Sequence, residues 1–271
     1  IEMAQRIIDA HNHNNWLGLT TDKIIKNMDD SGIEKCVLLA CELPEDEYYN
    51  IEDYQFTDPR YKDMPFESAI AAREKYPDRF ILGWAPNPRN QYSRSRLKAA
   101  VDTYNVKVYG ELKCRMRYDD PSAIATYQYC GKLKLPVLFH LECPKHITDF
   151  MSEDMKNWPI WYGGPISVVE NMCSLCPDTI FIGHGPGYWL EISGDADSVK
   201  TNYPDGKVTP GGRLVELMRK HKNLYSDLSA GSGLNSLRRD IEHAHKFLTE
   251  FQDRIIFGRD CFSRDLQDFL N

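Results

Sequence analysis

Short apolar runs alternate with amphipathic segments along almost the whole chain, and this alternation constrains the fold more than any other feature. Eight runs are typical of buried strands: 6–13, 35–40, 80–84, 106–112, 135–141, 179–183, 223–227 and 254–258. Seven segments have helical periodicity: 21–31, 66–75, 93–104, 121–132, 164–176, 211–221 and 237–251. Strands that alternate with helices form parallel sheets through right-handed crossovers, and eight such units fit a closed (β/α)8 TIM barrel better than an open sheet.

The length and the unbroken pattern favour one domain. The chain has 271 residues, of which 42% are hydrophobic, and barrels of about 250 residues commonly form a single domain. We find no repeat, linker or low-complexity tract, and therefore expect one barrel domain over residues 1–271. Three loops are longer than a barrel requires: 42–64, 143–163 and 185–212. Each follows a strand, so we expect all three to lie over the mouth of the site as lids or specificity elements.

The overall charge and the apolar runs exclude some classes of partner. The formal net charge is −7, from 40 acidic and 33 basic residues, and without a segregated basic face this balance disfavours nucleic acid. No run approaches the roughly 18 apolar residues of a membrane helix, and the first residues do not form a signal peptide. We therefore expect no membrane partner. The 8 cysteines are unevenly spaced, which favours reduced thiols in a cytoplasmic protein.

Side chains of the metal-ligand type stand at the ends of several predicted strands. His11 and His13 end the first run one residue apart, so they point to the same face of a strand. Four more such residues each follow or end a separate run: Glu111, His140, His184 and Asp260. Because the chemistry of a (β/α)8 barrel lies at the C-terminal ends of its strands, we expect these side chains to converge there. Asp227 and Ser229, near the end of the seventh run, could also face the pocket, but they carry no diagnostic spacing.

The same positions resemble those of a known family, the amidohydrolase superfamily. The resemblance covers nearly the whole chain and rests on four markers: Asp9-Ala-His-Asn-His13, His140, Gly183-His-Gly-Pro-Gly187 and Phe257-Gly-Arg-Asp260. The most similar branch is the amidohydrolase-related group that contains aminocarboxymuconate-semialdehyde decarboxylase and pyrone-dicarboxylate lactonase. The resemblance implies a (β/α)8 barrel enzyme that depends on a metal and acts as a hydrolase or a decarboxylase.

The resemblance also implies a set of metal ligands. His11, His13, His140 and Asp260 would bind one ion, and His184 would bind a second ion or hydrogen-bond the substrate. Glu111 follows Gly110 in a pair similar to the source of a bridging carboxylate in the related metal-dependent deoxyribonuclease branch. Two ions could therefore bind if Glu111 points inward. No lysine occupies the Glu111 position, so a bridge of carbamylated lysine is excluded; the structural alternative is a Glu111 paired with Lys113 or Arg115.

A divalent ion in such a site lowers the pKa of a bound water from about 15.7 toward neutrality. Asp260 could ligate the ion with one oxygen and exchange the water's proton through the other, while His184 could stabilise the developing oxyanion. Zinc suits imidazole-rich ligation best, and manganese or another first-row ion suits sites in which carboxylates join.

Three basic residues follow the fourth strand at the expected mouth of the site: Lys113, Arg115 and Arg117. Arginine binds carboxylates through a bidentate fork, so one of these side chains could anchor an acidic substrate. A surface ion pair with Asp119 or Asp120 is the structural alternative, and we favour it.

Three functions remain open from the sequence. The leading hypothesis is hydrolysis of a small amide, lactone or related ester by a metal-activated water. The alternative is nonoxidative decarboxylation of a small carboxylic acid at the same site, and the third is a barrel that binds a ligand or metal without turnover. A deoxyribonuclease is a weaker fourth alternative, which Gly110-Glu111 favours and the acidic charge balance disfavours. Only nine residues follow Phe262, too few for a full eighth outer helix. We therefore expect a short helix or the partner subunit of a homodimer to cover that side.

Overall fold

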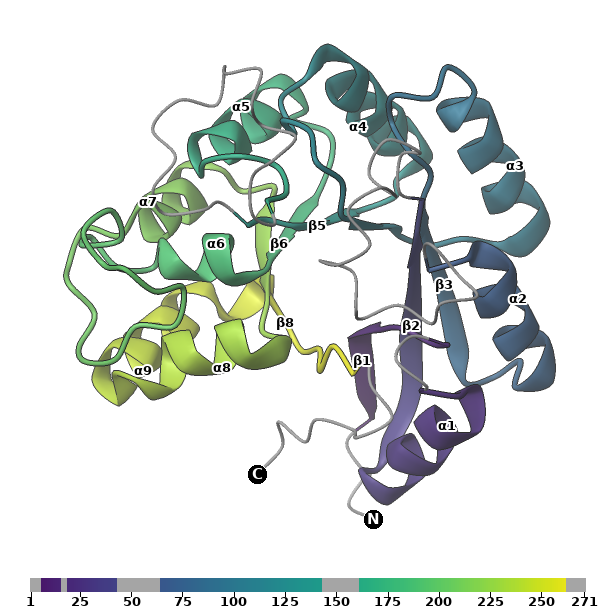
Figure 1. Ribbon diagram of the computed structural model, residues 1–271, viewed down its shortest axis with the longest axis horizontal. Helices are drawn as coiled ribbons and strands as arrows, with labels where there is room; N and C mark the ends of the chain where they lie inside the picture. Colours follow the sequence, from purple (N-terminus) through teal and green to yellow (C-terminus); the bar gives the residue numbers. More distant parts are fainter. Residues whose placement is uncertain (1–5, 16–18, 43–63, 143–160, 262–271) are drawn as a thin grey trace.

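The computed structural model describes residues 6–15, 19–42, 64–142 and 161–261. Within these ranges, strands stand at the centre and helices surround them, as Figure 1 shows. The strands, in chain order, are β1 Ile7–Asn12, β2 Ile33–Cys41, β3 Phe80–Ala85, β4 Tyr109–Leu112, β5 Val137–His140, β6 Phe181–His184, β7 Leu224–Asp227 and β8 Ile255–Ile256. Each was predicted as an apolar run of the sequence, although β8 is shorter than its run.

All strand pairs are parallel, and the strands follow one another in sequence order. One sheet has the order β1-β2-β3 and the other has the order β4-β5-β6-β7-β8. Backbone hydrogen bonds connect the two sheets at both edges: Trp84 N donates to Val108 O at 3.0 Å, and Ala10 N donates to Phe257 O at 3.0 Å. The strands therefore form the (β/α)8 barrel that the sequence predicts.

The helices form the outer ring (Figure 1): α1 Thr21–Asp30, α2 Phe66–Lys75, α3 Ser93–Tyr104, α4 Pro121–Leu133, α5 Ser167–Leu175, α6 Pro186–Leu190, α7 Arg213–Lys220, α8 Ala230–Arg238 and α9 Ile241–Phe251. Side chains fix several of their starts. Thr20 accepts from Lys23 N at the start of α1, and Asp240 accepts from His243 N at the start of α9. Such caps satisfy backbone N–H groups that have no partner inside the helix.

The structure differs from the sequence prediction around the last helices. The predicted helix at 237–251 is two elements, because α8 ends at Arg238 and α9 begins at Ile241 after its cap Asp240. The sequence predicted neither α8 nor the five-residue α6. The first turns of α8 contain Gly231 and Gly233, which have low helix propensity. Tertiary packing therefore outweighs local propensity here.

Two of the predicted long loops, 42–64 and 143–163, lie largely outside the described residues, as does the chain after Cys261 on which the expected short helix or partner contact depends. The third, 185–212, is described and begins with α6.

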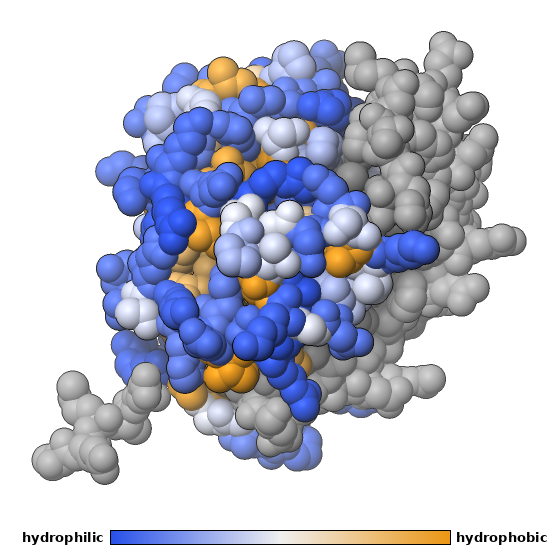
Figure 2. Space-filling model, turned by 90° about the vertical axis from the view of Figure 1, so that its left-hand side faces the viewer, coloured by the Kyte–Doolittle hydropathy of each residue, from blue (hydrophilic) through white to orange (hydrophobic). Residues whose placement is uncertain are grey.

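Figure 2 shows the side of the molecule that carries α7 and α9. This side is mostly hydrophilic, and its hydrophobic side chains form separate small areas. Among the described helices, none is both long enough and apolar enough to span a membrane.

An aliphatic layer inside the barrel supports the site. Leu138 precedes His140 by two residues and Ile182 precedes His184 by two residues, so each lies on the same face of its strand as the histidine. Both side chains are buried, and they form one cluster with the buried residues Val37 and Leu39. Close packing in this layer leaves little freedom to the strand ends above it.

A buried ion pair fastens β1 to the chain after β8. Arg259 Nε donates to Asp9 Oδ2 at 2.7 Å, Arg259 N donates to Asp9 Oδ1 at 3.0 Å, and both side chains are almost completely buried. Asn27 and Ser31 accept from the other end of the guanidinium. Burial raises the pKa of Asp9, and the charge and hydrogen bonds of Arg259 oppose that rise. The pair therefore fixes the segment that carries Asp260 beside the segment that carries His11.

We expect Asp9→Ala to lower the free energy of unfolding by about 3–5 kcal/mol, because it leaves the Arg259 charge buried without its partner. Urea denaturation of the metal-free protein measures this change. Glu34→Ala is the matched control, because it breaks the solvent-exposed pair of Glu34 with Arg6 and should change stability little. Equal effects of the two substitutions would contradict the role given to Asp9.

Candidate metal centre

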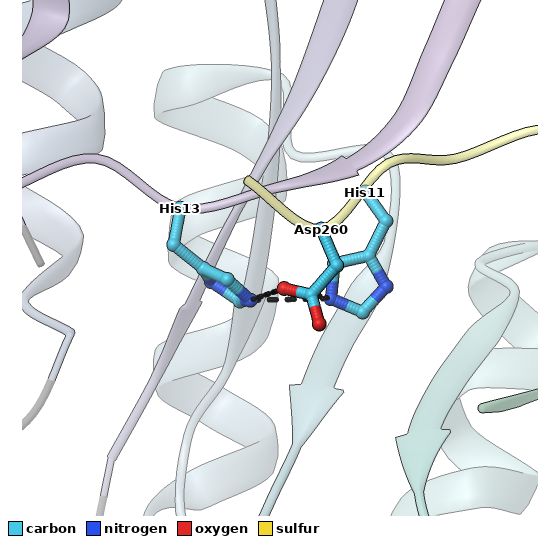
Figure 3. A group of neighbouring side chains, drawn as sticks. All are labelled: His11, His13 and Asp260. Carbon is cyan, nitrogen blue, oxygen red and sulfur yellow. Dashed lines mark hydrogen bonds and ion pairs between the residues drawn. The ribbon is translucent and has the colours of Figure 1, made fainter. Parts of the chain in front are cut away.

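A bulge in β1 brings the first two histidines into the barrel. Asp9 pairs with Cys36 and Asn12 pairs with Leu38, so three steps of β1 lie against two steps of β2. Such an extra residue bends the strand and re-aims its side chains. The rings of His11 and His13 both point into the barrel, and their Nε2 atoms lie 3.1 Å apart (Figure 3).

Two buried carboxylates face these nitrogens. Asp260 Oδ1 lies 3.6 Å from His11 Nε2 and 3.3 Å from His13 Nε2, and Glu111 Oε2 lies 3.9 Å and 3.4 Å from the same two atoms. Asp260 has a left-handed backbone, with φ of 54°, and its N–H donates to His11 O at 2.7 Å. Both oxygens are buried, and neither has a hydrogen-bond partner among the described residues.

His11, His13 and Asp260 together fit part of the ligand set of a divalent ion, and Glu111 Oε2 lies within reach of both histidine nitrogens. Tetrahedral zinc with bonds of about 2.0–2.1 Å separates its ligand atoms by about 3.3–3.4 Å. The separations measured here between imidazole nitrogens, or between an imidazole nitrogen and a carboxylate oxygen, run from 3.1 to 3.9 Å. Unpaired buried oxygens carry a large free-energy cost unless a cation or donor compensates them. The donor set and its spacing therefore fit a metal ion.

Hydrogen bonds on the far side of each ring fix which nitrogen faces the centre. His11 Nδ1 lies 2.6 Å from Asp227 Oδ2, and His13 Nδ1 lies 2.9 Å from Leu39 O. A carboxylate and a carbonyl only accept hydrogen bonds, so both Nδ1 atoms carry the hydrogen. As neutral ligands, the two rings would therefore turn bare Nε2 atoms toward the carboxylates, as metal-ligating histidines do.

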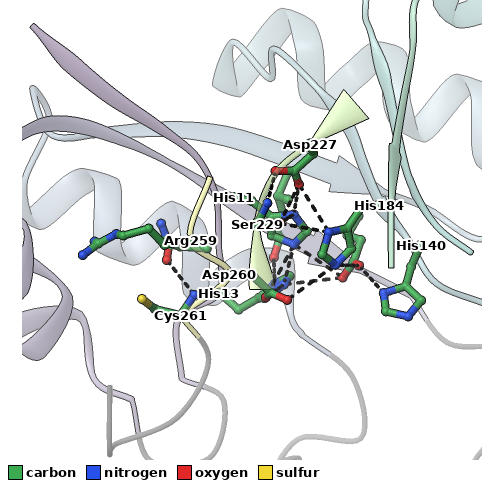
Figure 4. Close-up of polar contacts among 12 residues, drawn as sticks. His11, His13, His140, His184, Asp227, Ser229, Arg259, Asp260 and Cys261 are labelled. Carbon is green, nitrogen blue, oxygen red and sulfur yellow. Dashed lines mark hydrogen bonds and ion pairs between the residues drawn. The ribbon is translucent and has the colours of Figure 1, made fainter. Parts of the chain in front are cut away.

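His184 enters from β6 on the other side of Asp260. Its Nε2 lies 3.5 Å from Asp260 Oδ2 and 3.9 Å from Glu111 Oε1, while its Nδ1 lies 2.9 Å from Ser229 Oγ (Figure 4). Burial and the charge of His11 lower the pKa of His184, which favours the neutral ring. Asp260 thus directs one oxygen to the histidine pair of β1 and the other to His184.

His140 lies beside Glu111, but its ring is held differently. Its Nδ1 lies 2.9 Å from Glu111 Oε1 and its Nε2 lies 3.2 Å from Glu142 Oε2. Burial and Lys113 lower the pKa of His140, but the hydrogen bonds to the two carboxylates raise it more. With no ion present, both ring nitrogens donate to these carboxylates. Glu111, His140 and His184 nevertheless form a second group whose ligand atoms lie close enough together to hold a metal ion.

Negative charge accumulates at the centre. Burial lowers the pKa of His11, but the charges of Asp260 and Asp227 outweigh it and raise that pKa to about 10. The pKa values of Glu111 and Asp260 lie well below their usual range, because nearby positive charges and hydrogen bonds outweigh burial. A site of ionised carboxylates that holds a proton on a buried histidine so strongly is electrostatically suited to a cation.

The three predicted substrate-binding residues lie in different surroundings. Lys113 extends over the Tyr162 ring, with its Nζ atom 5.5 Å from the ring centroid, and its charge acts on Glu111 and Asp260. Arg117 instead forms a bidentate pair with Asp119 at 2.9 and 2.8 Å, which is the structural alternative that the sequence favoured. Arg115 is half-buried on the same segment.

The structure places three further side chains at the centre: Glu142, which the sequence analysis did not name, and Asp227 and Ser229, to which it gave no role. A signal for them was present, because His140-Leu-Glu142 and Asp227-Leu-Ser229 repeat the one-residue spacing of His11 and His13. At the end of a strand, this spacing puts both polar side chains on one face.

The family is shown by a match over almost the whole chain. Residues 8–268 match the amidohydrolase family, and the chain belongs to it. It is therefore an enzyme of the amidohydrolase superfamily, whose members depend on a metal, and the cluster of histidines and carboxylates fits that class.

Solved structures show the same fold at low sequence identity. An uncharacterized TIM-barrel protein from Bordetella bronchiseptica has a TM-score of 0.57 at 13% identity, over 94% of this chain and 85% of that one. A probable 2-pyrone-4,6-dicarboxylic acid hydrolase from Acinetobacter baumannii has a TM-score of 0.53 at 12% identity, over 94% and 84%. The 5-carboxyvanillate decarboxylase from Sphingomonas paucimobilis has a TM-score of 0.53 at 14% identity, over 94% and 88%. No curated protein matches the sequence.

We expect Asp227→Asn to weaken metal binding about 10–100-fold, because it disturbs the hydrogen bond that orients His11. Competition with a chromophoric chelator measures the dissociation constant. Asp119→Asn, which alters the contacts of Asp119 with Arg117 and Asn171, is the control and should leave that constant unchanged. An Asp227→Asn variant with wild-type affinity would show that Asp227 does not support the ion.

Proposed function

We propose that this enzyme is a metal-dependent hydrolase of a small organic substrate, an amide, a lactone or a related ester. One observation carries the proposal: the two oxygens of Asp260 face different partners. Oδ1 faces the His11 and His13 nitrogens, and Oδ2 faces His184 Nε2 at 3.5 Å. A carboxylate in this position can hold an ion with one oxygen and exchange a proton through the other.

The ion would be held by His11, His13, Glu111 and Asp260. We propose that it is Zn²⁺. Mn²⁺ or another first-row ion is the alternative, because two of the four ligands are carboxylates. When bound, such an ion lowers the pKa of a coordinated water toward about 7 and so supplies a nucleophile at neutral pH.

The balance of charge supports one ion rather than two. Among the described residues, four carboxylates surround the centre: Glu111, Glu142, Asp227 and Asp260. Lys113 and the doubly hydrogen-bonded His140 supply two positive charges, and His11, which holds a proton when no ion is present, would lose that proton on becoming a ligand. The remaining excess of two negative charges is what one divalent ion neutralises, and buried sites of this kind tolerate little net charge.

The side chains around the ion would complete the reaction. Asp260 Oδ2 would take the proton of the attacking water and return it to the leaving group as a general acid. Lys113 would attract an anionic group of the substrate, because its ammonium stands beside the centre and remains charged there. The interior position of these groups keeps bulk water from competing with the substrate.

A second candidate is nonoxidative decarboxylation of a small carboxylic acid at the same site. Proteins of the same fold support it, since 5-carboxyvanillate decarboxylase and 2,6-dihydroxybenzoate decarboxylase both resemble this chain in structure. In that reaction Lys113 and the ion would hold the substrate carboxylate, and Asp260 would deliver a proton to carbon. Release of carbon dioxide from aromatic acids, with no hydrolysis of lactones or amides, would favour this candidate.

We expect Asp260→Asn to lower kcat by about 10²–10⁴-fold, because the amide cannot take the proton of the attacking water. The experiment first screens lactones, amides, esters and aromatic acids with the wild-type protein loaded with metal, then measures the variant on the active substrate. Circular dichroism and metal content show whether the variant keeps its fold and its ion. Activity near the wild-type level in the metal-loaded variant would remove Asp260 from the mechanism.

A further inference from the structure

One buried hydroxyl joins two histidines of the centre to the carboxylate behind them. Ser229 Oγ lies 2.7 Å from Asp227 Oδ2, 2.9 Å from His184 Nδ1 and 3.2 Å from His11 Nδ1 (Figure 4). The Ser229 side chain is 1% exposed, so water does not replace these partners. Ser229 N also donates to Asp227 Oδ1 at 2.9 Å, which holds the serine in this position.

The hydroxyl has one hydrogen to give, and its surroundings decide where that hydrogen goes. Asp227 is a buried carboxylate that accepts from His11 Nδ1, and a carboxylate has no hydrogen to donate. The Ser229 hydrogen therefore points to Asp227. The Oγ atom can then only accept from the two rings, so His184 Nδ1 must carry a hydrogen.

We propose that Ser229 is a positioning residue that fixes His184 as the Nδ1–H tautomer and thereby turns a bare Nε2 toward Asp260 and Glu111. The other side of the ring agrees with this assignment. Nε2 lies 3.5 Å from Asp260 Oδ2 and 3.9 Å from Glu111 Oε1, and both distances are longer than an ordinary N–H···O hydrogen bond. Three acceptor atoms thus face one another across a short gap.

This tautomer changes the role of His184 in catalysis. The following step rests on the proposed function. A bare Nε2 accepts a hydrogen bond and cannot donate one, so the neutral ring does not stabilise an oxyanion as the sequence analysis expected. It instead accepts from the hydrogen of the attacking water, beside the Asp260 oxygen that takes the proton. Two acceptors then orient one nucleophile, which fixes the direction of its attack.

The tautomer can be measured without substrate or turnover. Long-range proton–nitrogen correlation spectra of protein labelled with nitrogen-15 in histidine distinguish a bare ring nitrogen from a protonated one, and His184→Gln assigns the signals. We expect wild-type His184 to show a protonated Nδ1 and a bare Nε2 at neutral pH. A protonated Nε2 in the wild-type protein would overturn the proposal, whatever the behaviour of any variant.

Two variants of Ser229 test whether its hydroxyl is the cause. Ser229→Ala removes the acceptor, so the His184 signals should shift toward a mixture of tautomers, whereas Ser229→Thr keeps the hydroxyl and should restore the wild-type spectrum. Ser236→Ala is the control, because Ser236 is a buried serine of α8 that donates to Trp189 O and touches neither histidine. An unchanged spectrum of Ser229→Ala would show that another group fixes the tautomer.

Kinetics of the metal-loaded enzyme give a separate test. We expect Ser229→Ala to lower kcat about 10–100-fold with KM nearly unchanged, and Ser229→Thr to recover most of the loss. A loss in KM alone would contradict a role in orienting the nucleophile. Because the spectra need no substrate, a correct tautomer in a protein that hydrolyses nothing would refute the proposed function and leave the assignment of Ser229 intact.

Discussion

The centre depends on one electrostatic constraint: buried carboxylate oxygens and imidazole nitrogens face one another and need positive charge between them. His11 and His13 have their Nδ1 hydrogens committed behind them, and two carboxylate oxygens lack hydrogen-bond partners among the described residues. Acceptors in a low-dielectric interior repel one another unless a cation lies between them. A divalent ion removes this repulsion, and the same ion supplies the chemistry of the amidohydrolase superfamily, to which the chain belongs.

The fold holds this unfavourable arrangement in place from several directions. The Asp9–Arg259 pair fastens β1, the first strand, to the segment after β8, the last strand. The bulge in β1 turns His11 and His13 inward. Asp227 and Ser229 hold the back of two rings, while the aliphatic layer below fixes the strand ends. Because the ligands come from β1, β4 and the segment after β8, the free energy of folding opposes the local repulsion, as in other preorganised sites.

Much of the fold and of the candidate site could be predicted from the sequence, because the periodicity of the apolar residues and the position of ligand-type residues along the chain are local properties. The apolar runs predicted the strands. The ligand-type residues at the ends of those runs were predicted to be neighbours, and the structure brings them together: His11, His13, Glu111, His140, His184 and Asp260. The pairing of His140 with Glu142 could not be predicted in this way, since it depends on side-chain direction rather than on strand order. Helix α8 was missed for a related reason: its glycines and serines have low propensity, and packing alone makes it helical.

X-ray absorption at the edge of the bound metal tests the central claim most directly. The account predicts one ion per chain, with two imidazole nitrogens and oxygen donors at about 2.0–2.1 Å in its coordination shell. A shell that contains sulfur or three or more imidazoles, or a protein that takes up no divalent ion, would contradict it.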